Sequence, residues 1–252
     1  MITGASSGIG AELARIFAAN GHKTVLVARR EDRLSQLADE IAATGKSRPS
    51  TISCDLKAPG ACDSIAQKLS AMGVEVEIVV NNAGFGLFGN AVEMDRAEQL
   101  AMVDINVRVL TDLSLRFADS LIKHRGGLLN VGSIASFLPG PRMAVYYASK
   151  AFVLSFTEAM RGELGPMGVR VTALCPGPVP TEFQDRAGFE AGLDSAILNV
   201  SAAAVARAGY RGLMSNKRLV MPGVGVRMIP FLLRFAPRSM VLASVARVQQ
   251  KR

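Results

Sequence analysis

The chain has 252 residues, of which 49% are hydrophobic and 20% charged, and this length fits one large α/β domain better than two small ones. No apolar run reaches the roughly 18 residues of a spanning helix, and the N-terminus opens on a Gly-rich turn, so we expect neither a membrane span nor a signal peptide. The expected location is cytoplasmic. Three cysteines without CxxC spacing and two histidines argue against a metal site or a disulfide framework and favour buried, reduced thiols.

The net charge of +8 is concentrated at one end of the chain. Residues 195–252 hold 10 of the 29 Lys and Arg residues and no Asp or Glu. These basic residues alternate with Leu, Ile, Phe, Val and Met and do not form a recognisable nucleic-acid reader motif, so no nucleic-acid partner is expected.

Apolar, β-rich runs alternate with stretches of helical period, which is typical of a parallel sheet covered by helices on both faces. Strands are expected at residues 24–28, 50–54, 77–80, 127–131, 169–174 and 218–221. Helices are expected at about 9–20, 31–44, 60–72, 95–123 and 147–165. The sequence predicts one doubly wound α/β domain over residues 1–223, followed by a basic, amphipathic helical extension at 224–252.

A Gly-rich turn, TGASSGIG at residues 3–10, stands directly before the first predicted helix. Such glycines let backbone N–H groups and the helix N-terminus approach a pyrophosphate, whose charge the helix dipole favours. The turn lacks the Gly-Lys-Ser/Thr ending of a P-loop. Taken alone, it could also be a purely structural corner between strand and helix.

The residue that follows the second strand selects between two dinucleotides. A carboxylate there would bind the ribose 2′-hydroxyl of NAD, but this chain has Arg29, followed by Arg30 and Arg33. A guanidinium cannot accept a hydrogen bond from a hydroxyl but pairs bidentately with a 2′-phosphate, which favours NADP(H) over NAD(H). The alternative is that these arginines pair with Glu31 and Asp32 at a solvated helix start.

Further polar residues follow the next strands: Asp55 comes after the third, and the segment NNAG at 81–84 after the fourth. The carboxyl ends of parallel strands lie at the edge where ligands bind, so both motifs are expected there. Asp55 could also simply cap the next helix.

Ser133, Tyr146 and Lys150 are the candidate catalytic residues. Tyr146 and Lys150 are four positions apart in YYASK, which places them on one face of a helix. A phenol with a pKa of about 10 is a poor acid or base at neutral pH, and a nearby ammonium lowers that pKa. A general acid/base for a carbonyl/alcohol pair needs such a shift. An ordinary surface pair is the alternative.

Together these motifs resemble those of the short-chain dehydrogenases/reductases. The resemblance covers residues 1 to about 223 and rests on TGASSGIG, NNAG, Asn106, Ser133, YYASK, and Pro176-Gly177 with Thr181. It implies a Rossmann fold and an NAD(P)-dependent oxidoreductase.

The resemblance also implies a role for each catalytic residue. Tyr146 would be the acid/base, and Ser133 would polarise the substrate carbonyl. Lys150 would bind the nicotinamide ribose and lower the Tyr146 pKa, and Asn106 would hold a water that links Lys150 to solvent. The expected cofactor-binding residues, with the two arginines, are Gly4, Ser6, Ser7, Gly8, Ile9, Gly10, Arg29, Arg30, Asp55, Asn82, Ala83, Gly84, Tyr146, Lys150, Pro176, Gly177 and Thr181.

The chain departs from the family in two places. Only Met1 and Ile2 precede Thr3, so either the first strand is truncated or the start is misassigned. The second departure is residues 224–252, which could pack over the substrate cleft or between subunits, or could lie on an anionic lipid surface. We favour packing, which would bury the apolar side chains of the extension (Met228, Phe231, Leu232 and Phe235), because Pro230 and Pro237 interrupt the helical period.

The sequence therefore predicts an NADP-dependent oxidoreductase that interconverts a ketone or aldehyde and an alcohol. A lipophilic substrate is expected, held by apolar residues after Thr181: Phe183, Phe189, Leu193, Ile197 and Leu198. The alternatives are an NAD-dependent alcohol dehydrogenase of the same family and a dinucleotide-binding protein without catalytic activity. The expected assembly is a homodimer or homotetramer.

Overall fold

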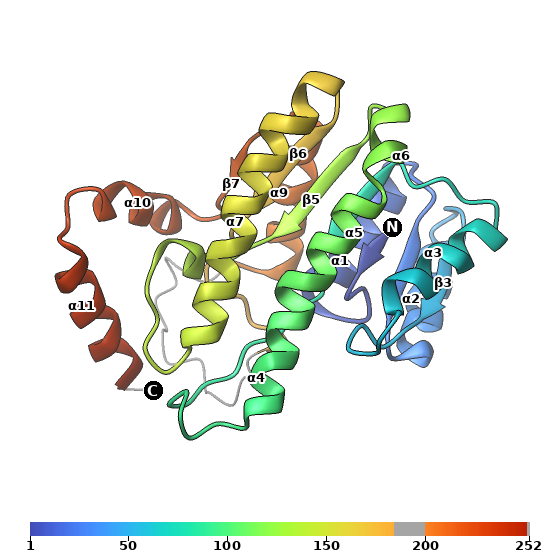
Figure 1. The fold of residues 1–252 in the computed structure, drawn as a ribbon. Helices are drawn as coiled ribbons and strands as arrows, with labels where there is room; N and C mark the ends of the chain where they lie inside the picture. Colours follow the sequence, from blue (N-terminus) through green and yellow to red (C-terminus); the bar gives the residue numbers. More distant parts are fainter. Residues whose placement is uncertain (184–199, 251–252) are drawn as a thin grey trace.

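The computed structural model describes residues 1–183 and 200–250, and within them seven parallel strands form one sheet (Figure 1). The strand order is β3-β2-β1-β4-β5-β6-β7. The strands are β1 Ile2–Thr3, β2 Val25–Ala28, β3 Ser50–Ser53, β4 Ile78–Asn81, β5 Gly127–Val131, β6 Arg170–Leu174 and β7 Leu219–Val220. The predicted doubly wound parallel sheet is confirmed.

Helices cover both faces of the sheet. One layer contains α1 (Gly8–Ala19), α2 (Glu31–Ala43) and α9 (Ala202–Met214), and the other contains α3 (Ala61–Ala71), α4 (Arg96–Val103), α5 (Leu110–Arg116) and α7 (Ala144–Leu164). Strand residues alternate between the two layers: Val25 and Val27 join one apolar cluster, whereas Leu26 and Ala28 join the other. This two-sided burial explains why the strands other than β3 are nearly continuous apolar runs.

The strand order reverses between β1 and β4. In an open parallel sheet, a ligand site is expected at such a reversal. Crossovers leave β1 and β4 on opposite faces, which opens a crevice at the carboxyl ends of these strands. The first strand is as short as the sequence indicates. Its two residues are nevertheless buried, and the strand is paired on both sides, because Ile2 pairs with Leu26 of β2 and with Val80 of β4.

The predicted helices differ from the structure in three respects. The single helix expected at 95–123 is α4, a π-helical stretch at Asp104–Val109, α5, and α6 at Ala118–Lys123. The helix expected from residue 147 begins at Ala144, and α9 was not predicted. Gly209 and Gly212 lower the helical propensity of α9, yet a Cβ at either position would lie within 2.7 Å of Leu174 or 2.2 Å of Val220. The two glycines therefore allow α9 to pack closely on β6 and β7, and this packing outweighs their low helical propensity.

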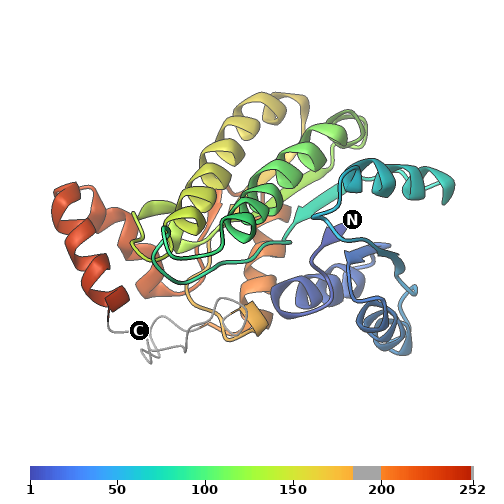
Figure 2. The same cartoon turned by 60° about the horizontal axis from the view of Figure 1, so that its bottom comes forward.

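The C-terminal extension consists of α10 (Val224–Leu233) and α11 (Arg238–Gln250), which lie together at one end of the molecule beyond the sheet (Figures 1 and 2). Packing within the chain does not bury four of the apolar side chains that were expected to be buried, whereas packing between subunits, the other form of that expectation, stays a prediction. The exposed fractions are 48% for Met228, 53% for Phe231, 58% for Leu232 and 75% for Phe235. Val226, on another face of α10, joins the core instead. No helix in the described ranges is long and apolar enough to cross a membrane.

Candidate active site

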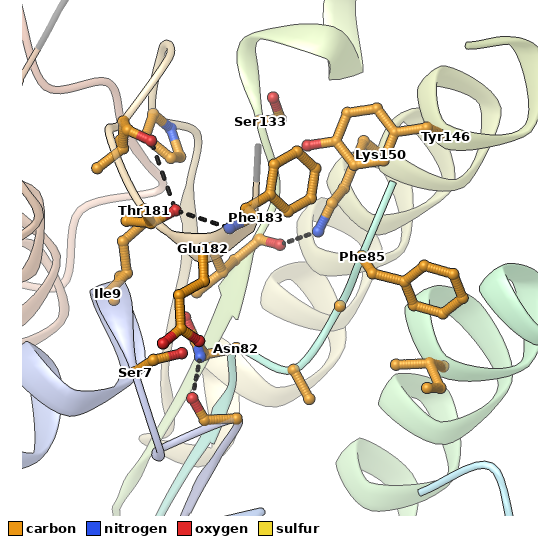
Figure 3. A pocket seen from close by; sticks show the side chains of 18 of the residues that line it. Ser7, Ile9, Asn82, Phe85, Ser133, Tyr146, Lys150, Thr181, Glu182 and Phe183 are labelled. Carbon is orange, nitrogen blue, oxygen red and sulfur yellow. Dashed lines mark hydrogen bonds between the residues drawn. The ribbon is translucent and has the colours of Figure 1, made fainter. Parts of the chain in front are cut away.

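A cavity of about 500 Å³ opens at the carboxyl ends of the strands (Figure 3). Its wall combines the turn after β1, the segments that follow β2 to β6, and the first turns of α7. Apart from Gly10, every residue expected to bind the cofactor contributes to this wall, and so does Ser133. The fold therefore brings into one cavity residues that lie up to 177 positions apart, from Gly4 to Thr181.

The Gly-rich turn is shaped for close approach. Gly4 has φ +65°, and a Cβ there would lie 2.8 Å from Asn82 Nδ2. A Cβ on Gly10 would lie only 2.2 Å from the Gly4 carbonyl oxygen. Gly10 thus supports the turn from behind, and the two glycines let the N-terminus of α1 reach the cavity, where its dipole favours an anion.

Two side chains fasten this turn to the end of β4. Asn82 Nδ2 donates to the carbonyl oxygens of Thr3, at 3.0 Å, and of Gly4, at 3.2 Å. Thr3 Oγ1 accepts hydrogen bonds from the backbone N–H groups of Asn82 and Ala83, both at 3.1 Å. In this structure the Asn82 side chain holds the binding turn, while the residue also lines the cavity.

The two arginines after β2 differ in their contacts. Arg30 donates to Ser6 Oγ at 3.2 Å and forms an ion pair with Glu182 at 2.7 Å. Glu182 also hydrogen-bonds Ser7, and these contacts, led by Arg30, lower the pKa of its carboxyl group. Arg29 lines the cavity and has no side-chain hydrogen bond or ion pair with any described residue. Glu182 is a cavity residue that sequence reasoning missed, because nothing in the local sequence pairs it with Arg30.

Asp55 has a local contact that fits its alternative role. One of its carboxylate oxygens accepts a hydrogen bond from the Lys57 backbone N–H at 3.1 Å, as in a turn cap. The residue is exposed and also lines the cavity, so the two roles are compatible. On the far side of the cavity, Thr181 contacts the Gly-rich turn, since a Cβ on Gly8 would lie 3.1 Å from it.

Tyr146 lies buried at the inner part of the cavity, beside Ser133 and Lys150 (Figure 3). Burial raises the pKa of its phenol to about 12, and a hydrogen bond with the Ser133 side chain offsets part of that rise. Ser133 is held in place because its Oγ caps a short 3-10 turn and accepts from the Ala135 N–H at 3.1 Å. The phenol is therefore protonated at neutral pH.

Lys150 is also buried, and its ammonium donates to the Val131 carbonyl oxygen at 2.8 Å. Burial lowers the pKa of this amine to about 8. The Nζ atom lies 5.9 Å from the centroid of the Tyr146 ring. Burial is the largest influence on the pKa of both groups. That Lys150 lowers the Tyr146 pKa stays a prediction.

Asn106 lies in the π-helical stretch and outside the cavity wall. Its Nδ2 donates to the Phe85 carbonyl oxygen and to Ser149 Oγ, both at 3.0 Å, and its Oδ1 accepts from the Phe85 N–H at 3.1 Å. The side chain thus ties the segment after β4 to α7. That Asn106 holds a water, as the resemblance implies, stays a prediction.

The side of the cavity next to Tyr146 is apolar. The ring centroids of Phe183 and Tyr146 are 5.4 Å apart, and a Cβ on Gly86 would contact Phe183 and Met143 at 2.8 and 3.3 Å. Phe85 and Met143, which the sequence did not single out, complete this wall. Of the other expected apolar residues, Phe189, Leu193, Ile197 and Leu198 lie outside the described residues.

Comparison with models of protein families assigns the chain to a family. A family model described as short chain dehydrogenase matches residues 1–190. The chain belongs to the short-chain dehydrogenase/reductase family. As in other members of this family, the expected activity class is that of an NAD(P)-dependent oxidoreductase, and the resemblance seen in the sequence is confirmed.

Several relatives of this short-chain dehydrogenase/reductase carry a stated activity or a bound cofactor. Sulfoacetaldehyde reductase 2 of Chromohalobacter salexigens is 39% identical over 186 residues, 73% of each chain. A short-chain dehydrogenase from Sphingobium yanoikuyae, solved with NADPH, aligns with TM-score 0.84 and 30% identity over 95% of this chain and 93% of that one. A bulky-bulky ketone specific alcohol dehydrogenase from Comamonas testosteroni aligns with TM-score 0.76 and 29% identity over 88% and 84%.

The geometry of the cavity fits the dinucleotide that short-chain dehydrogenases/reductases use. A Cβ on Gly4 or Gly10 would collide with Asn82 or with the Gly4 carbonyl oxygen and so distort the turn. The N-terminus of α1 lies at the cavity, and two guanidinium groups follow β2. These residues would hold a nicotinamide dinucleotide, with its phosphates at the turn. Among the described residues, no group of three His, Cys, Asp or Glu side chains could hold a metal ion.

Proposed function

We propose that this protein is an NADP(H)-dependent reductase that converts a lipophilic ketone or aldehyde to an alcohol. The observation that carries the proposal is the position of the Tyr146 phenol, which hydrogen-bonds the Ser133 side chain inside a cavity whose other end is lined by the Gly-rich turn. Carbonyl reduction requires a proton donor at the carbonyl oxygen, and the phenol holds such a proton.

When bound, the cofactor supplies the hydride. The chain's own residues manage the carbonyl oxygen: Ser133 Oγ donates a hydrogen bond that polarises the carbonyl, and Tyr146 donates the proton that completes the alcohol. Lys150, anchored on the Val131 carbonyl oxygen, adds positive charge beside the phenol in its protonated form. A pKa of about 8 for its amine keeps most of that charge at neutral pH.

The preference for NADP(H) is supported by the charges that follow β2. Ala28 ends that strand, and the next two residues, Arg29 and Arg30, both line the cavity. Arg29 has no side-chain partner among the described residues and can form a bidentate pair with a 2′-phosphate. An NAD-dependent alcohol dehydrogenase would place an acceptor carboxylate there, and the first acids, Glu31 and Asp32, lie in the first turn of α2.

The lipophilic substrate is supported by the wall next to Tyr146. Phe85 and Met143 are buried, and Phe183 lies against the Tyr146 ring. An apolar chain placed there would replace water at an apolar surface. We also expect a cytoplasmic homodimer or homotetramer, and the exposed apolar side chains of α4 and α5 (Leu100, Val103 and Leu115) support association.

A substrate panel assayed with NADPH and NADH side by side tests this function. The panel should contain medium- and long-chain ketones and aldehydes, together with sulfoacetaldehyde as a small anionic aldehyde. We expect faster turnover with NADPH and a kcat/KM that rises with chain length. Preference for sulfoacetaldehyde would refute the lipophilic substrate, preference for NADH would refute the cofactor assignment, and binding without any turnover would favour the non-catalytic alternative.

A further inference from the structure

Helix α10 presents apolar side chains on two of its faces. Val226 is fully buried in the core, whereas Met228, Phe231, Leu232 and Phe235 are between 48% and 75% exposed. These four residues are spaced i, i+3, i+4 and i+7, which places them in one stripe along the helix and its continuation. A surface helix of a globular protein normally carries polar residues there. We call this stripe the α10 stripe.

The surroundings of the α10 stripe are basic. Arg227 and Arg234 precede Met228 and Phe235 and are exposed, as are Arg238 and Arg247 of α11. No acid occurs in residues 195–252, and no ion pair among the described residues involves any of these four arginines. The exposed side chains Met240, Leu242 and Val248 of α11 add apolar surface beside them.

We propose that α10 and α11 form a docking surface for an anionic lipid membrane, with the α10 stripe inserted among the headgroups and the arginines paired with lipid phosphates. Exposed apolar side chains at helical spacing with flanking arginines are the features of a helix that lies in the membrane interface. The two helices lie at one end of the molecule, beyond the sheet and its covering helices (Figures 1 and 2), and the side chains of the α10 stripe are exposed.

A second copy of the chain fits this surface less well. Most homo-oligomer contacts are two-fold, so that a patch meets the same patch on its partner. Such a contact would bring the arginines of two copies together without a carboxylate from residues 195–252 to pair with them. An anionic membrane supplies the missing negative charge.

The docking surface is joined to the rim of the active site. Near the end of α11, the Gln249 carbonyl oxygen accepts a hydrogen bond from Arg142 at 2.8 Å, and Gln249 Nε2 donates to Tyr147 Oη at 3.0 Å. Tyr147 lines the cavity and neighbours Tyr146. A membrane bound at α10 and α11 would therefore lie beside the substrate end of the cavity, which suits the lipophilic substrate proposed above.

Vesicle sedimentation tests the docking surface without depending on the substrate. The full chain is mixed with vesicles of phosphatidylcholine alone, or with about one third phosphatidylglycerol, at low and high salt. We expect binding only to the anionic vesicles and its loss at high salt. The double variant Arg234→Gln, Arg238→Gln should bind roughly thirtyfold more weakly, because each basic residue near an anionic surface contributes about a fivefold factor.

Matched controls distinguish binding through this surface from nonspecific electrostatic or hydrophobic adsorption. Arg207→Gln with Arg211→Gln makes the same charge change on α9, and Met72→Ser with Met167→Ser removes exposed apolar side chains elsewhere. Both should keep wild-type binding, whereas Phe231→Ser with Leu232→Ser should lose it while keeping the wild-type melting temperature.

Two outcomes would overturn the proposal. One is a wild-type protein that ignores anionic vesicles at low salt. The other is Phe231→Ser with Leu232→Ser converting an oligomer to a monomer in sedimentation velocity without affecting vesicle binding, which would assign the surface to a second copy. Turnover of a water-soluble substrate should be unchanged in all these variants, so the outcome is independent of the proposed function.

Discussion

Lys150 holds a buried amine that costs stability. Its pKa is lowered to about 8 by burial, although its Nζ donates to the Val131 carbonyl oxygen. In the unfolded chain the same amine has a pKa of about 10.4. The folded state therefore binds this proton less tightly, and the penalty is complete below pH 8. It disappears as the pH rises towards the unfolded pKa.

Lys150→Met should accordingly stabilise the protein at pH 7 while it impairs catalysis. We expect a gain in the free energy of unfolding of about 1–2 kcal/mol, which is the burial cost less the lost hydrogen bond. The gain should shrink as the pH rises from 8 to 10. Urea unfolding of the wild type and the variant at pH 7 and pH 10 measures this gain. A variant that is less stable than the wild type at pH 7 would contradict the prediction.

Arg29 should set the choice of cofactor. Arg29→Asp replaces a phosphate-binding fork with a hydroxyl acceptor that repels a 2′-phosphate, so the preference should move from NADPH towards NADH by on the order of 2–4 kcal/mol. The NADPH/NADH ratio of kcat/KM measures this shift. Arg33→Asp makes the same charge change outside the cavity wall and should leave the ratio nearly unchanged. An unaltered ratio in Arg29→Asp with Arg30→Ala would remove the assignment.

At the scale of elements, the N-terminus of α1 can approach the Gly-rich turn only because residue 10 is a glycine without a side chain. A Cβ on Gly10 would lie 2.2 Å from the Gly4 carbonyl oxygen and 2.5 Å from Asn82 Nδ2. The first contact belongs to the Gly-rich turn and the second to the Asn82 side chain that holds this turn, so an added methyl group must push α1 away from them. The position of the helix and the affinity for the cofactor are thus coupled.

Gly10→Ala should lower the free energy of unfolding by about 1–3 kcal/mol and weaken NADPH binding further. Gly162→Ala is the matched control, because Gly162 lies within α7 and a Cβ there would meet nothing within 4 Å. That variant should gain about 0.5–1 kcal/mol from helix propensity. Thermal unfolding with and without NADPH distinguishes the two, and equal effects would contradict the close-approach argument.

The elements show what sequence patterns can and cannot predict. Strong periodicity and apolar runs gave the alternating order of strands and helices, whereas α9 escaped because Gly209 and Gly212 serve packing on the sheet. The π-helical stretch within the region expected as one helix at 95–123 contains Asn106, whose side chain bonds Phe85 and Ser149 from other elements. Such tertiary contacts leave no periodic signal in the sequence.

At the scale of the whole molecule, the topology explains why widely separated motifs form one site. Parallel strands align their carboxyl ends, so the residues that follow them were predictable as neighbours before any contact was known. The ion pair between Glu182 and Arg30 and the exposure of the α10 stripe could not be predicted in this way. Both depend on tertiary contacts between segments that are distant in the sequence. Contacts within the chain therefore leave the α10 stripe exposed, and packing of the extension between subunits stays a prediction.

The central claim is that Tyr146 delivers the proton in carbonyl reduction by NADPH, and Tyr146→Phe tests it most directly. The ring that packs against Phe183 is kept and only the hydroxyl is lost, so NADPH should bind as before while kcat falls by about a hundredfold or more. Tyr147→Phe, with its hydroxyl bonded to Gln249, should have a mild effect. A Tyr146→Phe enzyme that keeps a substantial part of its kcat, while Tyr147→Phe does not, would contradict the account.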